Sequence, residues 1–139
     1  MKTSGYSGTP LAKKLGIKDG YKIRLINQPE YYFDLFDALP EKIEFIKDKK
    51  IKKDFIHCFV KDSEVLEKEI TALKKEIVPN GMIWISWPKK SSKVITDITE
   101  GLIRKLALAN GLVDVKVCAV DDVWSGLKLV IPVKDRTAE

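Results

Sequence analysis

The chain has 139 residues, of which 45% are hydrophobic and 32% are charged, a length and composition typical of one globular domain. This balance excludes a disordered tail, a collagen-like repeat and a membrane protein. Two cysteines and one histidine are too few for a disulfide framework or a closed zinc site. We expect a flexible or docked arm over residues 1–8 and a single domain over residues 9–139. A cytoplasmic location is expected because the first ten residues, MKTSGYSGTP, lack the apolar core of a secretory signal.

The net charge of +5 is unevenly distributed along the chain. Residues 1–29 carry +5, residues 42–53 carry +4 and residues 77–96 carry +3. Because 22 of the 25 basic residues are lysines, and bidentate phosphate recognition favours arginine, most of this charge is expected to be solvated surface.

The first part of the chain predicts short alternating elements. The expected helix 30–39 rests on an apolar stripe with helical spacing, and the lysine run 47–53 is expected to be a solvated loop. The elements are a helix from Pro10 to Gly16 with Thr9 as its cap, a strand over 22–27, the helix over 30–39 and a strand over 43–46.

The second part predicts longer elements and a closing hairpin. Residues 54–60 are apolar at both odd and even positions, which is typical of a central strand covered on both faces. Asp97, with Glu100 three residues later, predicts a capping box for the last helix. The remaining elements are a helix capped by Ser63, a strand over 82–87, a helix ending at Asn110-Gly111, and strands over 114–120 and 127–133.

This order of elements predicts an α/β fold with a Rossmann-like three-layer arrangement, a mostly parallel sheet and a C-terminal antiparallel hairpin. The layout resembles class I S-adenosylmethionine-dependent methyltransferases. Residues 73–86 (LKKEIVPNGMIWIS) are similar to the segment that leads into the fifth strand of those enzymes. The resemblance implies an S-adenosylmethionine site after the first strand.

The sequence departs from that family where the cofactor would bind. The first strand ends in Asn27-Gln28-Pro29-Glu30, which contains no glycine and stands in place of a glycine-rich loop, and Pro29 has no N–H to donate. Asp48 is the one candidate for the acidic residue after the second strand. We therefore expect no cofactor, and S-adenosylmethionine is the alternative.

A second set of motifs spans nearly the whole chain: SGTPLAKKLG at 7–16, WPKK at 87–90, TD and TE at 96–97 and 99–100, VDVKVC at 113–118 and WSGLK at 124–128. These motifs resemble those of an uncharacterised family of small bacterial proteins, and this resemblance implies no established activity.

The candidate site lies where the parallel strands end, because ligands of open α/β sheets bind at the carboxyl edge. Asn27, Gln28 and Tyr31 follow the first strand there. The loop 88–97 and the helix start after it add four further candidates, and this loop would hold a small anion or be a plain solvated loop. These four are Lys89, Lys90, Asp97 and Thr99.

The closing hairpin supplies the remaining candidates. Its two aspartates at 121 and 122 could bind a divalent cation or act in acid–base chemistry. The alternative is that they only begin a turn. The candidates here are Asp121, Trp124, Ser125 and Lys128. His57 and Cys58 point to opposite faces of their strand and are expected in the core.

Three functions remain open from the sequence. The first is a non-enzymatic binding or regulatory module for a small anionic ligand or a protein partner. The second is a divergent S-adenosylmethionine-dependent methyltransferase. The third is a nucleic-acid accessory protein that uses lysines in 47–53 and 89–93.

Overall fold

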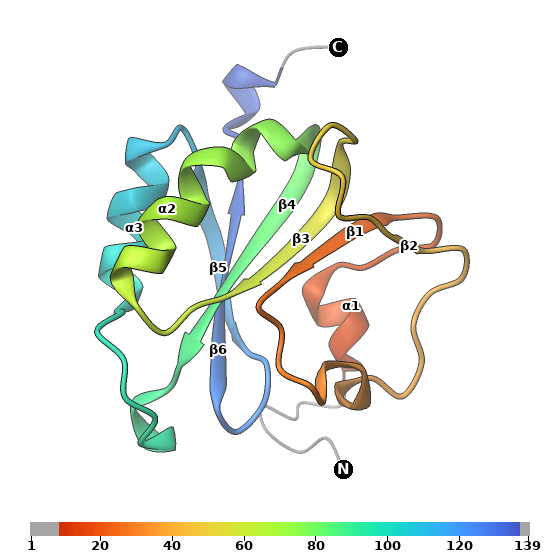
Figure 1. Cartoon of the computed structure of the whole chain (residues 1–139). Coiled ribbons are helices and arrows are strands. Elements are labelled where there is room, and N and C mark those ends of the chain that lie inside the picture. The colour runs from red at the N-terminus through yellow and green to blue at the C-terminus, as the bar shows by residue number, and fades with distance from the viewer. Residues whose placement is uncertain (1–8, 137–139) are drawn as a thin grey trace.

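A six-stranded mixed β-sheet forms the middle layer of the computed structural model, which describes residues 9–136 (Figure 1). The predicted arm over residues 1–8 lies outside the described residues. The strands are β1 (Lys22–Ile26), β2 (Glu44–Phe45), β3 (Lys53–Phe59), β4 (Ile77–Pro88), β5 (Val113–Ala119) and β6 (Trp124–Val130). The helices are α1 (Leu11–Leu15), α2 (Ser63–Leu73) and α3 (Glu100–Ala109), with 3₁₀ turns η1 (Tyr32–Leu35), η2 (Lys74–Glu76), η3 (Lys90–Ser92) and η4 (Val133–Asp135).

The strand order is β2-β1-β3-β4-β6-β5. β1 pairs in parallel with β2 and β3, and β3 pairs in parallel with β4. β6 runs antiparallel to both β4 and β5, which places the closing hairpin at one end of the sheet. The predicted α/β fold, mostly parallel with an antiparallel C-terminal hairpin, is confirmed.

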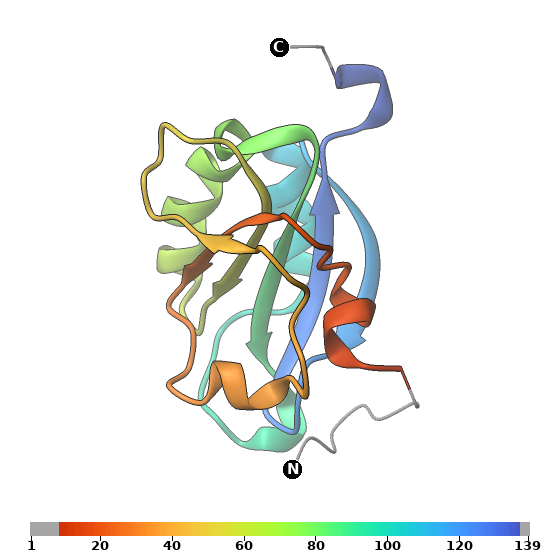
Figure 2. The same cartoon turned by 90° about the vertical axis from the view of Figure 1, so that its right-hand side faces the viewer.

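Helices cover the two faces of the sheet unequally, as Figure 2 shows. α2 and α3 pack on one face through Leu66, Ile70 and Ile103, which are fully buried. α1 and η1 cover the other face through Leu15 and Tyr32. The molecule therefore has three layers, and in the thinner layer α1 packs on β4, where Trp84 Nε1 donates to the Leu15 carbonyl, while Tyr32 of η1 packs on β3.

The central strand β3 shows why this arrangement forms. Its alternate residues face opposite layers: Ile56 and Cys58 join the cluster under α2 and α3, and Phe55 and Phe59 join the cluster under α1 and η1. The prediction that His57 and Cys58 are core residues on opposite faces is confirmed, because neither is exposed. The apolar hairpin residues Leu127, Leu129 and Ile131 also belong to the core.

The predicted helix over 30–39 is wrong in length and type. The structure has only the 3₁₀ turn η1, and Phe36 after it is already extended, with φ −112° and ψ 132°. One short turn is enough to bury Tyr32, Leu35 and Phe36, so the helical spacing of these residues did not require a helix. The aromatic run from Tyr31 to Phe33 also has low helix propensity.

The predicted solvated lysine loop ends one residue earlier than expected, because Lys53 is fully buried at the start of β3. Its Nζ lies 3.3 Å from Oε1 of Glu76, which is itself 3% exposed. Arg24 Nη1 donates to both carboxylate oxygens of Glu76 at 2.7 Å. This buried ionic cluster (Arg24, Lys53 and Glu76) joins β1, β3 and η2.

β4 begins five residues before the predicted strand and contains an irregularity. The pairing with β3 jumps from Lys53↔Ile77 to Phe55↔Met82. A Cβ at Gly81 would lie 2.9 Å from Cβ of Ile77 and 3.1 Å from the Lys53 carbonyl oxygen, so the close approach requires glycine.

None of the helices in the described part of the chain has both the length and the apolar character that a membrane span needs.

Candidate functional site

Four segments meet at the carboxyl edge of the parallel strands, the lower end of the molecule in Figure 1. They are residues 27–31 after β1, 60–63 after β3, 88–97 after β4 and the hairpin turn 120–123 before β6. The chain leaves β1 toward the layer of η1 and leaves β3 toward the layer of α2. The edge between β1 and β3 is therefore the topological switch point, where α/β sheets bind their ligands.

The predicted residues Tyr31, Asp121 and Trp124 lie together at this edge. Trp124 Nε1 donates to the Tyr31 hydroxyl at 3.1 Å, which joins the hairpin to the loop after β1. Asp121 Oδ1 accepts the backbone N–H groups of Val123 and Trp124 at 2.8 and 2.7 Å. The carboxylate therefore orders the turn, in agreement with the turn alternative of the sequence analysis.

The Tyr31 hydroxyl has an altered acidity. Partial burial and the neighbouring Asp121 carboxylate raise the pKa of Tyr31 to about 12. Because this group stays protonated at neutral pH, it can donate a hydrogen bond but cannot act as a base. The Trp124 ring also packs edge-on against Phe59 of β3, with the ring centroids 5.0 Å apart.

Asn27 and Gln28 are exposed directly after β1. Asn27 has φ 55°, in the left-handed region that glycine usually occupies and that asparagine tolerates better than most residues. The loop therefore makes, without a glycine, the sharp exit from the first strand.

The loop 88–97 is fixed by its own contacts. The Lys89 backbone N–H donates to the Val123 carbonyl at 2.7 Å, so this loop is attached to the hairpin turn. Lys90 begins η3 and is exposed. The loop thus brings Lys89 and Lys90 to the same edge as Trp124.

The predicted capping box at Asp97 is wrong. Thr99 caps α3, because its side chain accepts the Leu102 N–H at 3.1 Å. Asp97 instead accepts the backbone N–H and the hydroxyl of Ser63 at 2.7 Å, at the start of α2, and these hydrogen bonds lower the pKa of Asp97. Both residues therefore stabilise helix ends.

Ser125 and Lys128 are not brought to the site. Ser125 pairs with Trp87 within the sheet, on the face of α2 and α3. Lys128 pairs with Trp84 and Lys116 in the middle of the sheet, where burial and the charges of Lys116 and Lys18 lower its pKa. Asp48 lies in the loop that leads into β3, at the opposite edge from the loop after β1, so it cannot serve there.

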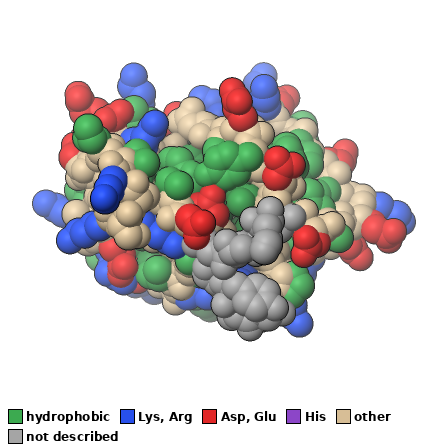
Figure 3. Space-filling view, turned by 90° about the horizontal axis from the view of Figure 1, so that it is seen from below, with side chains coloured by type: hydrophobic (Ala, Val, Ile, Leu, Met, Phe, Trp, Pro, Cys, Tyr) green, Lys and Arg blue, Asp and Glu red, His purple; other side chains and the backbone are tan. Residues whose placement is uncertain are grey.

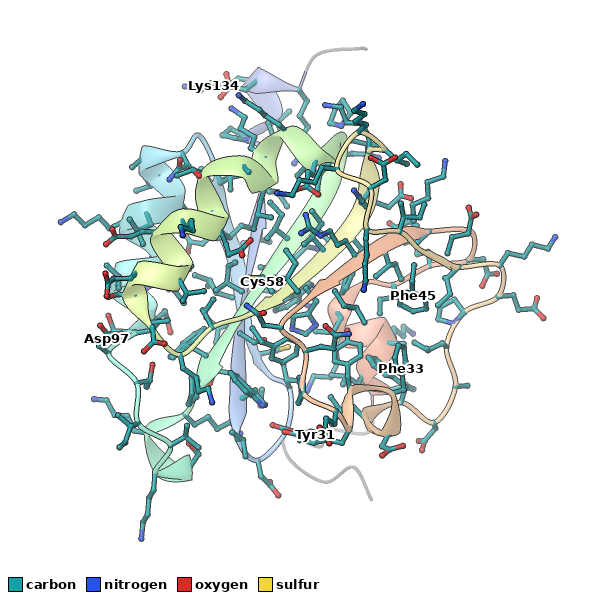
Figure 4. The ribbon with its side chains drawn as sticks, viewed as in Figure 1. Tyr31, Phe33, Phe45, Cys58, Asp97 and Lys134 are labelled. Carbon is teal, nitrogen blue, oxygen red and sulfur yellow. The ribbon has the colours of Figure 1, made fainter. Side chains whose placement is uncertain are left out.

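The structure adds residues that the sequence analysis did not select. Phe33 and Phe45 are about half exposed, and their rings meet edge to face with centroids 5.4 Å apart beside η1 (Figure 4). Lys61 and Asp62 are exposed after β3, at the switch point. Their position at the end of a buried strand is the signal that identifies Lys61 and Asp62.

Figure 3 looks onto this end of the molecule, where hydrophobic side chains lie beside acidic and basic ones. In Figure 4 Asp97 lies near the start of α2, well away from Tyr31 beside η1. The predicted residues therefore divide into a group around Tyr31 and Trp124 and a separate group at the ends of α2 and α3.

No family model matches the chain, and no curated protein matches its sequence. Solved structures do match. An S-adenosylmethionine-dependent methyltransferase from Aquifex aeolicus is 15% identical, with a TM-score of 0.57 over 86% of this chain and 87% of the other. A magnesium protoporphyrin IX methyltransferase from Synechocystis PCC 6803, with bound S-adenosylmethionine, is 13% identical, with a TM-score of 0.56 over 87% and 74%.

A ribosomal protein L11 methylase from Lactobacillus delbrueckii subsp. bulgaricus is 12% identical, with a TM-score of 0.54 over 87% of this chain and 74% of the other. The chain has a methyltransferase-like Rossmann fold. These matches overturn two expectations from the sequence, a non-enzymatic binding module and the absence of a cofactor.

Proposed function

We propose that this protein is a divergent S-adenosylmethionine-dependent methyltransferase, with its cofactor at the switch point between β1 and β3. The observation that carries the proposal is the strand order β2-β1-β3-β4-β6-β5, with a reversed closing hairpin, in a fold similar to such enzymes. The carboxyl edge then holds the site by the general rule for open α/β sheets.

The side chains at this edge fit the chemistry of the cofactor. The exposed carboxylates of Glu30 and Asp62 would accept hydrogen bonds from ribose hydroxyls, and Lys61 would pair with the amino-acid carboxylate. Phe33 offers an aromatic surface to the purine ring. When bound, S-adenosylmethionine supplies a methyl group activated by its sulfonium.

Residues 27 and 28 would take the part of the missing glycine-rich loop. The left-handed conformation of Asn27 turns the chain away from the sheet directly after β1. The amide side chains of Asn27 and Gln28 provide both donors and acceptors at this position. In a glycine-rich loop the backbone lies close to the cofactor, whereas here the Asn27 and Gln28 side chains would form the hydrogen bonds to it.

Tyr31 and Trp124 would close one side of the site and exclude water from it. Their hydrogen bond joins the hairpin to the loop after β1, across the carboxyl end of β3. Because the Tyr31 hydroxyl is protonated at neutral pH, its role is to donate a hydrogen bond and to position neighbouring groups.

Cofactor binding is tested by thermal unfolding in the presence of S-adenosylhomocysteine. A ligand that binds only the folded state stabilises it, by about 2.7 kcal/mol at a concentration 100 times its dissociation constant. We expect a rise in melting temperature, and at least about a tenfold weaker affinity in Glu30→Gln, because a charge-assisted hydrogen bond contributes about 1.5–3 kcal/mol.

Glu41→Gln is the matched control, since Glu41 is an exposed carboxylate at the opposite edge, next to Gly20 before β1. Its melting temperature should rise with ligand as in the unmodified protein. The absence of any rise with millimolar S-adenosylhomocysteine or S-adenosylmethionine would contradict the proposal.

The nucleic-acid alternative receives no support from the arrangement of the lysines. Lys53 is buried, and the loop 47–52 leads into β3 at one edge while Lys89 and Lys90 lie at the other. These two groups cannot form one continuous groove. Membership of the family of small bacterial proteins, and a cytoplasmic location, remain part of the proposal.

A further inference from the structure

A cavity of about 300 Å³ opens at the amino edge of the sheet, at the end of the molecule opposite the proposed cofactor site (upper end of Figure 1). Its charged lining consists of Lys52, Lys74, Lys75, Arg136 and Asp135. Its apolar lining consists of Ile77, Pro79 and Ile131. Four positive charges and one negative charge therefore surround a small apolar floor.

The positive charges of this cavity are not neutralised. Within residues 9–136, none of Lys52, Lys74, Lys75 and Arg136 forms an ion pair. Arg136 uses only Nε, which donates to the Ile131 carbonyl at 2.8 Å and fixes the side chain at the cavity wall. Its two terminal nitrogens remain available for a ligand.

The buried ionic cluster fixes the chain next to the lysines of the cavity. Lys74 and Lys75 directly precede Glu76, whose buried carboxylate accepts hydrogen bonds from Arg24 and Lys53. Lys52 directly precedes Lys53. Lys52 and Lys75 are therefore each adjacent in sequence to a side chain whose position is fixed by buried contacts, and Lys74 lies two residues before Glu76. These contacts limit the movement of the backbone that carries the lysines, which reduces the entropy lost when a ligand binds.

Lys74 has a further contact that defines where its ammonium lies. A Cβ at Gly111 would lie only 2.5 Å from Lys74 Nζ, so the side chain crosses directly over this glycine at the end of α3. Gly111 also has φ 76°, which disfavours any larger residue.

We propose that this cavity binds the phosphate groups of a small phosphorylated ligand of the nucleotide class. Clustered lysines and arginine recognise phosphate, by point charge and by directed hydrogen bonds respectively. The apolar floor of Ile77, Pro79 and Ile131 accommodates the organic part of such a ligand. The volume is at the lower end of the range for small-molecule pockets.

A small ligand fits better than a nucleic-acid strand. An extended backbone needs a positive groove along several nucleotides, whereas the basic loop 88–97 lies at the opposite end of the sheet from the cavity and from the loop 47–52. The cavity is also walled on one side by Asp135, which limits the surface open to a long anion.

The experiment titrates the full chain with pyrophosphate, adenosine triphosphate and single-stranded RNA, by calorimetry and by amide chemical shifts. We expect both small ligands to bind and to shift the backbone amides of residues 74–78, 131 and 133–136. Lys75→Glu should weaken their binding at least about tenfold, because it removes an attraction and adds a repulsion. Lys52→Ala should weaken it to a smaller degree.

Lys105→Glu is the matched control, because it makes the same change of net charge at an exposed position on α3 outside the cavity. It should leave affinity unchanged, and circular dichroism should show all variants folded. The proposal is overturned if neither small ligand binds at millimolar concentration, if RNA alone binds, or if Lys105→Glu weakens binding as much as Lys75→Glu. S-adenosylhomocysteine binding should persist in Lys75→Glu.

Discussion

At the scale of single residues, His57 is the clearest case of a polar group placed inside the core. Its Nδ1 lies 3.0 Å from the Tyr32 hydroxyl and its Nε2 lies 2.8 Å from Ser86 Oγ. Both partners are hydroxyls, which can donate or accept, so a neutral imidazole is satisfied in either tautomer. Burial lowers the pKa of His57 to about 3.

This pKa predicts a loss of stability in mild acid. Because the unfolded imidazole takes up a proton near pH 6.5 and the folded one does not, the unfolded state binds more protons below that pH. Stability is then complete above pH 6.5 and falls as the pH decreases toward 3, by about 2 kcal/mol at pH 5. Urea unfolding at several pH values measures this slope.

His57→Gln removes the titrating group, so its unfolding free energy should depend less on pH between 6.5 and 4 than that of the unmodified protein. The comparison concerns the slope and holds even if the variant is less stable overall. Parallel slopes in the two proteins would show that His57 is protonated in the folded state.

At the scale of elements, the sequence before α3 offers several possible capping residues, and only one of them caps the helix. Thr96, Asp97 and Thr99 all lie within one turn of its start. Thr99 caps the helix itself, while Thr96 donates from Oγ1 to the Lys61 carbonyl at 2.6 Å and Asp97 reaches Ser63. The start of α3 is therefore joined to the start of α2.

Thr99→Ala should destabilise the protein by about 1 kcal/mol, because it removes the acceptor for the Leu102 N–H at a helix end. Thermal or urea unfolding measures the change. Thr71→Ala is the control, since Thr71 is an exposed threonine inside α2 where alanine is a better helix former. Equal losses in the two variants would contradict the capping role.

At the scale of the whole molecule, the buried ionic cluster connects elements that are distant in sequence. Arg24 comes from β1, Lys53 from β3 and Glu76 from η2, and the Lys53 side chain is fully buried. Removing one partner of such a cluster leaves an uncompensated charge inside the protein. Losing one member of the cluster should therefore lower the free energy of unfolding by more than the loss of one exposed ion pair would.

Glu76→Ala should cost about 3–5 kcal/mol of unfolding free energy, the range for breaking a buried pair. The control is Glu100→Ala, which breaks an exposed pair with Arg104 one helical turn away and should cost less than about 1 kcal/mol. Urea unfolding of both variants provides the comparison. A loss below about 1 kcal/mol in Glu76→Ala would show that water solvates Lys53.

The sequence predicts the sheet well because its central strands carry a strong signal. β3 and β4 are apolar at both odd and even positions, and a closing hairpin follows α3. These two features together define the topology of the sheet. The helix predicted at 30–39 fails because one 3₁₀ turn buries the same side chains. Local spacing cannot distinguish the two.

The site is predicted only in part, because its contacts join distant residues. The hydrogen bond between Tyr31 and Trp124 spans 93 positions, and the one between Ser63 and Asp97 spans 34. Each strand end could be located from the sequence, but the partner of each side chain could not. Likewise, the burial of Lys53 depends on Glu76, and a run of lysines predicts only a solvated surface.

β4 connects the two ends of the molecule. Ile77 and Pro79 line the cavity at its start, and Pro88 at its end leads into the loop joined to the hairpin. Twelve residues at about 3.3 Å each separate these points by roughly 30–40 Å, farther than one small ligand can reach. Any effect of phosphate on cofactor affinity would thus be allosteric, and by linkage the cofactor would change phosphate affinity by the same factor.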